Sequence, residues 1–217
     1  MICSLSLLLL LGSGCQNTKP TEEVARAAST PADVKINSNP KKSGRLVVAL
    51  KARPTNPRYS GTFPGTTHPL FLNFLDERDP KDIIGKNTED EGKTVLIMCA
   101  AEGIGPLDFV REQLSQDLHD NGASLVSEPA LAGRRITLRL LRFWAEESPG
   151  YRADVRAAIE VKDSSGAVLW NGTAAGGNSR FGRSLKPDNY NECLTDSTIE
   201  MLGKLLGNSD FQKAIAR

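Results

Sequence analysis

The sequence predicts an α+β domain in which two helices pack on one face of a largely antiparallel sheet of about five strands. Three observations support this fold class. Apolar and polar residues alternate from Tyr151 to Lys162, apolar residues recur at helical spacing after Pro106 and after Pro187, and short turns separate the strands between residues 134 and 173. Two helices on one side of such a sheet would bury all of these apolar stripes.

Length and charge narrow the function classes. The chain has 217 residues, 39% of them hydrophobic and 24% charged, which is the composition of an ordinary globular protein. Its 27 Lys and Arg residues are balanced by 26 Asp and Glu residues, so the net charge is only +1. A chain with this balance has no overall field that would attract DNA, RNA or an anionic bilayer, and we expect no nucleic-acid partner.

The N-terminus has the features of a lipoprotein signal peptide, predicted for residues 1–14. Seven residues, Leu5 to Leu11, form an apolar run that is too short to span a membrane. The small residues Gly12-Ser13-Gly14 precede Cys15, the arrangement that a lipoprotein signal peptidase accepts. The alternative is an incidental cysteine beside an ordinary cleavage site. We expect Cys15 to carry palmitate-type acyl chains, and the absence of Asp after it, where Gln16 stands, favours the outer membrane.

Residues 15–43 are expected to form the lipidated cysteine and a flexible tether, and residues 44–217 a periplasmic α+β domain. The tether region is rich in polar residues, contains Pro20, Pro31 and Pro40, and lacks an apolar period. A flexible segment of this length would hold the domain about 30 Å from the membrane.

Several segments have a clear secondary-structure signal. We expect strands over 45–50, 94–100, 124–126, 134–144, 151–162 and 168–173, with a bulge where the alternation changes phase at Leu140 and Leu141. One helix should begin at Pro106 and end at Gly122; another should begin at Pro187 and end near Gly207, followed by a short helical tail over 210–216.

The stretch from Pro54 to Lys93 contains many Pro and Gly residues and is expected to be a long irregular excursion. It includes an apolar hexamer, Leu70 to Leu75. One interpretation is that this hexamer folds back to cover the second face of the sheet. The other is that Leu70, Phe71 and Phe74 form an exposed partner surface.

The motifs for catalysis or cofactor binding are incomplete. Gly92-Lys93-Thr94 lacks the earlier glycine of a phosphate-binding loop, because Asn87 stands there. Ser179 lies in a near match to a nucleophile elbow, and His68 and His119 are the two histidines of the chain. Helix-terminal His119 has a structural explanation in the helix dipole. We therefore expect no catalytic residue, no cofactor and no metal.

Two further features leave alternatives open. Cys99 and Cys193 have no metal-binding spacing and are either a disulfide in an oxidising compartment or buried free thiols. The strand region is also rich in arginine, which either forms a solvated face or a groove for an acidic partner. These arginines are Arg134, Arg135, Arg139, Arg142, Arg152, Arg156, Arg180 and Arg183.

The order of these elements resembles the YajG-like bacterial lipoproteins. The matching features are the lipobox, the tether, Arg53-Pro54 after the first strand, Asn121-Gly122-Ala123 after the first helix, the strand at Tyr151, the hairpin from Asp163 to Trp170, and Ser179-Arg180-Phe181-Gly182 before the terminal helix. The resemblance implies an outer-membrane lipoprotein of unassigned biochemical role and supplies no catalytic residue.

Three functions follow as hypotheses. The leading one is a non-enzymatic binding or adaptor module in the cell envelope, anchored to the membrane through Cys15 and bound to an envelope protein. The second is an accessory lipoprotein of an ABC-type lipid transport system, which would require an apolar groove between the first helix and the sheet. The third is a hydrolase that uses Ser179 or His68, which would require a carboxylate beside either residue in a pocket.

Overall fold

The computed structural model of this chain describes residues 44–52, 66–90, 93–182 and 184–216, all of which belong to one compact unit, Asn37–Arg217. The signal peptide, Cys15 and the tether predicted for residues 1–43 lie outside the described residues. The architecture given below is that of this unit alone.

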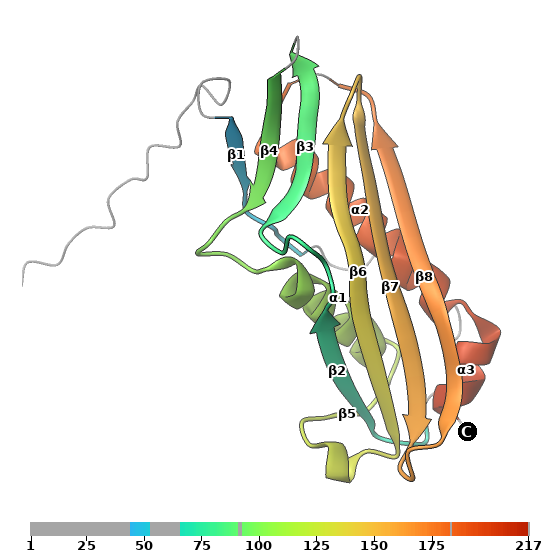
Figure 1. Cartoon of the computed structure of the whole chain (residues 1–217). Helices are drawn as coiled ribbons and strands as arrows, with labels where there is room; N and C mark the ends of the chain where they lie inside the picture. Colours follow the sequence, from blue (N-terminus) through green and yellow to red (C-terminus); the bar gives the residue numbers. More distant parts are fainter. Residues whose placement is uncertain (1–43, 53–65, 91–92, 183, 217) are drawn as a thin grey trace, which may run out of the picture. The chain divides into compact units, whose positions relative to one another are not determined.

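The described part of the chain is an α+β structure with eight strands in one sheet and three α-helices (Figure 1). The expectation of about five strands was therefore too low. The two predicted helices are present, and the short helical tail predicted for residues 210–216 is the third helix. The strands are β1 (Arg45–Val48), β2 (Leu70–Asp76), β3 (Ile83–Asp90), β4 (Lys93–Cys99), β5 (Leu125–Val126), β6 (Arg134–Glu147), β7 (Tyr151–Asp163) and β8 (Val168–Arg180). The helices are α1 (Pro106–Asp120), α2 (Pro187–Leu206) and α3 (Ser209–Ala216), with a 3₁₀ turn at Pro129–Leu131.

Three long strands, β6, β7 and β8, form the antiparallel meander that the alternating pattern predicts. The predicted bulge is confirmed, because the β6–β7 register shifts between Leu140 and Arg142. The turn after β7 is held by the carboxylate of Asp163, which accepts hydrogen bonds from the backbone N–H groups of Ser165 (2.8 Å) and Ala167 (3.0 Å). Gly166 has φ +91° in this turn, a conformation that glycine adopts without strain.

The stretch expected to be an irregular excursion contains two strands in its described part. Strand β2 pairs in parallel with the first half of β6, from Leu70 opposite Arg134 to Asp76 opposite Leu140. Strand β3 pairs in parallel with the last residues of β6 and antiparallel with β4. The sheet is therefore mixed, although its longest pairings are antiparallel, and β6 has β7 along one edge and β2 and β3 in succession along the other.

The helix boundaries follow the sequence signals. Pro106 and Pro187 occupy the first turns of α1 and α2, where a missing backbone N–H costs little. Gly122, with φ +82°, ends α1, and the N–H of Ala123 donates to the carbonyl of Leu118 at 2.9 Å. His119 lies in the last turn of α1, as predicted.

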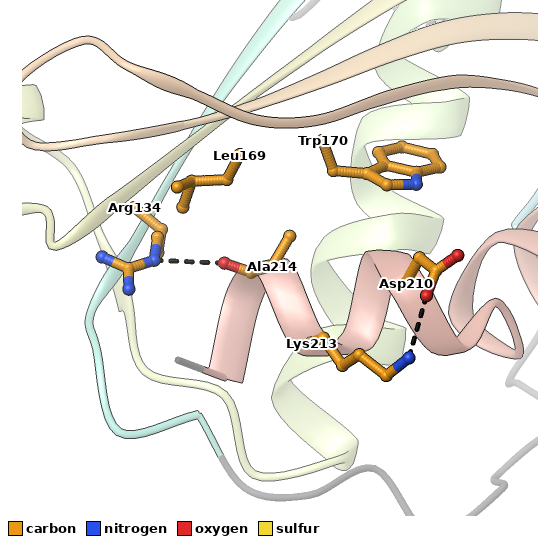
Figure 2. A pocket seen from close by; sticks show the side chains of 6 residues that line it. All are labelled: Arg134, Leu169, Trp170, Asp210, Lys213 and Ala214. Carbon is orange, nitrogen blue, oxygen red and sulfur yellow. Dashed lines mark hydrogen bonds and ion pairs between the residues drawn. The ribbon is translucent and has the colours of Figure 1, made fainter.

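The C-terminal helix α3 packs beside the beginning of β8. The rings of Trp170 and Phe211 meet edge to face with centroids 5.2 Å apart. The Nε of Arg134, at the start of β6, donates to the carbonyl of Ala214 at 3.1 Å (Figure 2). This helix therefore covers the same side of the sheet as α1 and α2.

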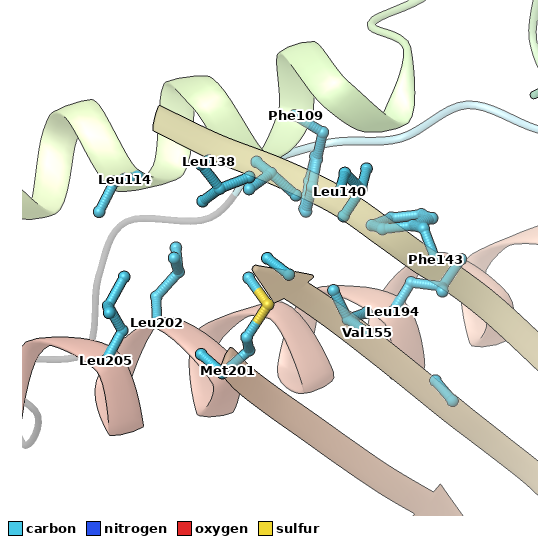
Figure 3. Close-up of a cluster of buried hydrophobic side chains, with 14 of the residues drawn as sticks. Phe109, Leu114, Leu138, Leu140, Phe143, Val155, Leu194, Met201, Leu202 and Leu205 are labelled. Atoms are coloured by element: carbon cyan, nitrogen blue, oxygen red, sulfur yellow. The ribbon is translucent and has the colours of Figure 1, made fainter. Parts of the chain in front are cut away.

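The core lies between the helices and one side of the sheet (Figure 3). Phe109 of α1 meets Phe143 of β6 edge to face, with ring centroids 5.9 Å apart. Leu138, Leu140 and Val155 of the sheet face Leu194, Met201 and Leu202 of α2, and all of these side chains are fully buried. Burial of apolar surface at about 25 cal/mol per Å² makes this side of the sheet the main source of stability.

Helix α2 approaches β8 closely at Gly176. A Cβ atom at this position would lie 2.5 Å from the backbone nitrogen of Met201 and would also overlap the carbonyl oxygen of Ser197. Farther along the helix, Glu200 accepts a hydrogen bond from the N–H of Gly177 (2.9 Å) and Lys204 donates to the carbonyl of Ala175 (3.2 Å). These two side chains form hydrogen bonds with backbone groups on the edge of β8, which would otherwise be available to pair with another strand.

A buried carboxylate fixes the loop that leads into α2. Glu147, fully buried at the end of β6, accepts hydrogen bonds from the N–H of Ser184 (3.0 Å) and from the hydroxyl of Tyr190 (2.8 Å). Burial raises the pKa of Tyr190, and the hydrogen bond to Glu147 raises it further, so the phenol stays protonated and donates. This loop places Leu185 at φ +40° and leaves Phe181 fully exposed.

Candidate functional site

The candidate site is the side of the sheet opposite the helices, which we call the open face. Strand register identifies its side chains, because residues that are opposite one another on neighbouring strands share a face. The open face comprises alternate residues of β6 and β7 and the residues of β8 opposite them, together with Phe71, Asn73 and Leu75 of β2, Lys86 of β3, Leu96 and Met98 of β4, and Arg45 and Val47 of β1. No described helix covers it (Figure 1).

Charge is unevenly distributed on this face. On strands β3, β6 and β7, register places seven basic and three acidic side chains on this face, an excess of four positive charges on a chain whose net charge is +1. The basic residues are Lys86, Arg135, Arg139, Arg142, Arg152, Arg156 and Lys162, and the acidic ones are Glu146, Asp154 and Glu160. Arg45 of β1 adds one more basic side chain, and Glu77, just beyond β2, adds one more acidic one. A local positive field therefore exists where the whole chain has almost none.

At the centre of the open face, two arginines share one carboxylate. Arg142 and Arg156 are directly opposite each other in the β6–β7 pairing. The Nε of each lies 2.8 Å from a different oxygen of Asp154. The hydrogen bond from Arg156 to Asp154 raises the pKa of that guanidinium, and both arginine side chains remain about half exposed. One negative charge thus fixes two positive ones, which leaves one positive charge without compensation.

The neighbouring rows contain further ion pairs. Arg139 is 3.8 Å from Glu77, which lies just beyond β2, Lys162 pairs with Glu160 at 2.6 Å, and Lys86 pairs with Glu146 at 3.2 Å. Arg135 is opposite Lys162, and its Nε is buried without a hydrogen-bond partner. Basic side chains therefore lie beside one another along the length of β6.

Apolar side chains are interspersed among these arginines. Arg142 lies over the ring of Trp144, with 5.7 Å from its guanidinium carbon to the ring centroid. Leu141, the extra residue of the bulge, is 42% exposed, and Leu75 of β2 is 44% exposed. The face is thus both basic and amphipathic.

The second half of β8 forms an almost flat part of the open face. Its residues on this face are Ser179, Gly177, Ala175 and Thr173, all with short side chains, whereas the larger Asn171 and Val168 lie toward the start of the strand. The longer side chains of Arg142 and Arg156 therefore stand above their surroundings on this part of the sheet.

A pocket of about 370 Å³ lies on the other side of the sheet, between α3 and the starts of β6 and β8 (Figure 2). Leu169, Trp170 and Ala214 form its apolar wall. Its polar groups are already bonded to one another or to the backbone: Lys213 pairs with Asp210 at 2.9 Å, and Arg134 donates to the carbonyl of Ala214. With these groups satisfied, the pocket gives less reason to expect a ligand than the open face does.

The residues predicted as a partner surface lie on both sides of β2. Leu70 is fully buried against the core, whereas Phe71 shares the open face with Arg135. Phe74 is half buried on the helix side, where Arg111 of α1 lies 5.3 Å from its ring centroid. The structure thus does not bring these three side chains together on one surface.

The candidates for hydrolysis are far apart. Ser179 lies on the open face near the end of β8, opposite Arg152, and its hydroxyl makes no hydrogen bond within the described part of the chain. His68 precedes β2 and packs against Gly133, at the opposite end of the β6–β7 pair. No group of three or more His, Cys, Asp or Glu side chains that could hold a metal occurs among the described residues.

Cys99 and Cys193 are both free thiols. The Sγ atom of Cys99 lies 3.5 Å from the carbonyl oxygen of Ile104, and that of Cys193 lies 3.5 Å from the carbonyl oxygen of Asn178. Burial raises the pKa of both thiols, that of Cys193 to about 11, so neither is an activated nucleophile.

The arginine-rich strands were noticed in the sequence, but only register sorts them by face. Arg135, Arg139, Arg142, Arg152 and Arg156 share the open face. Arg134 bonds to α3 and Arg180 pairs with Glu192 and Asp196 of α2, so these two belong to the helix side. Arg183 lies outside the described residues. The bulge at Leu141 was the signal that could have identified the change of face between Arg139 and Arg142.

Comparisons with known proteins add information on the fold. No family model matches the chain, and no curated protein matches it in sequence. It is similar to protein XCC0632 from Xanthomonas campestris, a DUF330 structure, with a TM-score of 0.51 and 13% identity over 75% of this chain and 94% of that chain. It also resembles a structure titled only as an uncharacterized protein (TM-score 0.46, 10% identity, 74% and 97% coverage) and a minor lipoprotein from Acinetobacter baumannii (TM-score 0.35, 14% identity, 67% and 91% coverage).

Of these structural similarities, only the first shows a shared fold. At 13% identity, the first one shows a shared fold and nothing about activity. TM-scores below 0.5 do not establish even a shared fold, so the other two lead to no conclusion. The resemblance to YajG-like lipoproteins therefore stays a prediction. None of the described helices is long and apolar enough to cross a membrane.

Proposed function

We propose that this chain is a lipid-anchored protein of the bacterial cell envelope, attached through Cys15 to the periplasmic side of the outer membrane, and that its folded part acts by binding and not by catalysis. The relation to YajG-like lipoproteins is part of this proposal. The supporting observation is the open face, a complete sheet surface that no described helix covers and that has an excess of positive charge. An uncovered basic face is a surface for an anionic partner.

The attachment rests on the sequence of the N-terminus. The run from Leu5 to Leu11 and the small residues before Cys15 match a lipobox. Two or more acyl chains on that cysteine would make anchoring stable, whereas one chain gives marginal binding.

The alternatives lack support in the described residues. An accessory role in lipid transport requires an apolar groove between α1 and the sheet, but Phe109, Val110, Leu114 and Leu118 fill this space and are almost completely buried. A hydrolase requires a nucleophile, a base and a carboxylate within hydrogen-bond reach of one another, and the positions of Ser179 and His68 do not provide this.

The test of anchoring is metabolic labelling with palmitate in a bacterial host. We expect label on the wild-type chain, release only by detergent, and no label on Cys15→Ala. A wild-type chain that takes no label, or that is released without detergent, would contradict the proposed attachment.

The test of the binding face is photo-crosslinking in cells. A photoreactive residue at Thr137 or Thr173 on the open face should give adducts with protein or lipid in the acylated chain. The same residue at Gln116, exposed on α1, is the matched control. Two results would show that the open face is not the binding surface. One is the same adducts from the acylated chain and from its Cys15→Ala variant, and the other is the same adducts from the open-face positions and from Gln116.

A further inference from the structure

The open face has the composition of a surface that lies against a membrane. We propose that this face docks on a bilayer containing anionic phospholipid, and that Arg142 and Arg156 bind the phosphates of its headgroups. This inference rests on the proposed function, because attachment through Cys15 keeps the domain close to a bilayer.

The first step concerns the two central guanidinium groups. Arg142 and Arg156 face each other across β6 and β7, and each contacts Asp154 through its Nε. Neither group makes another hydrogen bond within the described residues. Like charges directly opposite in a sheet repel, and a single carboxylate does not neutralise both. The remaining N–H groups point to a second anion with several acceptor oxygens, which a phosphate provides.

The second step concerns the side chains around them. Trp144 lies under Arg142, and Leu141 and Leu75 are exposed on the same side of the sheet. Indole rings and arginines with apolar stems are well suited to the boundary between headgroups and acyl chains, because each combines an apolar part with a polar end. The half-buried indole of Trp144 and the exposed Leu75 and Leu141 therefore give this basic face the apolar groups that a bilayer boundary accommodates.

The third step concerns how the charge is spread. The basic residues extend from Arg135 to Arg152 along strands of 14 and 13 residues, a distance of about 35 Å. They do not converge in a pocket, and the short side chains of β8 leave the arginines accessible. A wide, shallow positive field matches a continuous anionic surface better than it matches a compact acidic protein.

The experiment uses the acylated full-length chain reconstituted in phosphatidylcholine vesicles, with or without phosphatidylglycerol, and with a quencher lipid. Trp144 lies on the open face and Trp170 on the helix side, so two single-tryptophan variants, Trp170→Phe and Trp144→Phe, report on the two sides of the sheet. We expect quenching of Trp144 only when phosphatidylglycerol is present, reversed on going from about 0.1 M to about 1 M salt, and no change for Trp170.

Charge variants test the residues. Arg142→Gln with Arg156→Gln, made in the Trp170→Phe background, should lower the docking equilibrium about 30-fold, since each basic residue adds about a factor of five to binding at an anionic surface. Arg111→Gln with Lys213→Gln removes the same charge from exposed positions on α1 and α3 and should leave Trp144 quenched. Far-ultraviolet circular dichroism checks that each variant is folded.

Each result has a defined meaning. A chain that does not float with the vesicles has lost its anchor, which contradicts the proposed function. A chain that floats while Trp144 stays unquenched contradicts membrane docking alone. Binding of inorganic phosphate without quenching of Trp144, or shielding of Trp144 only by an added acidic protein, would likewise overturn the proposal. An equal loss of Trp144 quenching in the Arg142/Arg156 double variant and in the Arg111/Lys213 double variant would show that Arg142 and Arg156 have no special role.

Discussion

The two faces of the sheet are built by the same strands but are stabilised in different ways. On the helix side, Leu138, Val155 and their neighbours are fully buried against α1 and α2. On the open face, the alternate residues of these strands are charged and partly exposed, as in the Arg142–Asp154–Arg156 cluster. The comparison teaches that buried apolar packing and partly exposed charge lie on opposite sides of one sheet, so substitutions on the two sides should affect different measurements.

The largest contrast is expected at two adjacent glycines of β8. Gly176→Ala places a methyl group against the backbone of α2 at Ser197 and Met201, which forces the helix to move. We expect a loss of about 3 kcal/mol in the free energy of unfolding and a fall in Tm of about 6–12 °C, measured by thermal and urea unfolding.

Gly177→Ala is the matched variant on the open face. The nearest atom to its new methyl group is the carbonyl oxygen of Ala153 at 3.5 Å, an ordinary contact. Its unfolding free energy should change by no more than about 0.5 kcal/mol. Equal effects of the two variants would mean that α2 does not press on β8 as the structure shows.

The next comparison concerns two carboxylates that pair with arginine, Asp76 on the helix side of the sheet and Asp154 on the open face. Asp76 accepts hydrogen bonds from Arg78 at 2.9 and 2.8 Å, and the side chain of Arg78 is only 5% exposed. Asp76→Asn leaves this guanidinium poorly compensated and should cost about 3 kcal/mol. Asp154→Asn on the open face, where both arginine partners remain half exposed, should cost less than about 1 kcal/mol in urea unfolding.

The same pair predicts a pH dependence. Burial acts to raise the pKa of Asp76, but the hydrogen bonds and charge of Arg78 outweigh it, so this pKa lies below its ordinary value of 3.8. The contribution to stability is complete above 3.8 and is lost as the pH falls through the lowered value in the folded state. Urea unfolding from neutral to acid pH should show this loss in the wild type and not in Asp76→Asn.

Removal of a hydroxyl group tests a smaller difference. Tyr190→Phe deprives buried Glu147 of a donor at 2.8 Å and should cost about 2 kcal/mol. Ser179→Ala on the open face removes a hydroxyl that makes no hydrogen bond within the described residues, and should change stability by less than about 0.5 kcal/mol. Chemical denaturation of both variants measures the difference. An unchanged free energy of unfolding in Tyr190→Phe would show that Glu147 does not need the hydrogen bond from Tyr190.

The smallest effect on stability is expected at the edge of β8. Glu200→Ala with Lys204→Met removes the carboxylate that accepts from Gly177 and the ammonium group that donates to Ala175, at a cost of about 0.5 kcal/mol. The freed backbone groups should promote concentration-dependent self-association, measured by light scattering.

Two checks accompany this variant. Asp210→Asn with Lys213→Met breaks an ion pair on α3 and should stay monodisperse. The hydrogen bond from Lys204 lowers the pKa of Glu200 below 4.5. In the wild type, self-association through the edge of β8 should therefore be suppressed above that pH and should increase as the pH falls through the lowered value. Equal association of both double variants would show that these edge contacts are not protective.

The sequence alone determined the local structure of the chain. The alternation through β7, the proline starts of α1 and α2, the glycine end of α1 and the bulge at Leu140 were all predictable, because each depends on residues close together in the chain. The lipobox at Cys15 is likewise a local signal, and it remains a prediction.

Tertiary structure decided the rest. Strand β2 is held by parallel pairing with β6, a partner about 60 residues away. Strand β3 pairs with β6 as well as with its neighbour β4, and Gly85 within it gives no local strand signal. The arginines were visible in the sequence, but which of them share a face depends on register across β6, β7 and β8. The alternation of side chains within one strand can be seen in the sequence. The charge of a surface depends on how several strands are aligned, so only the folded sheet could show the open face.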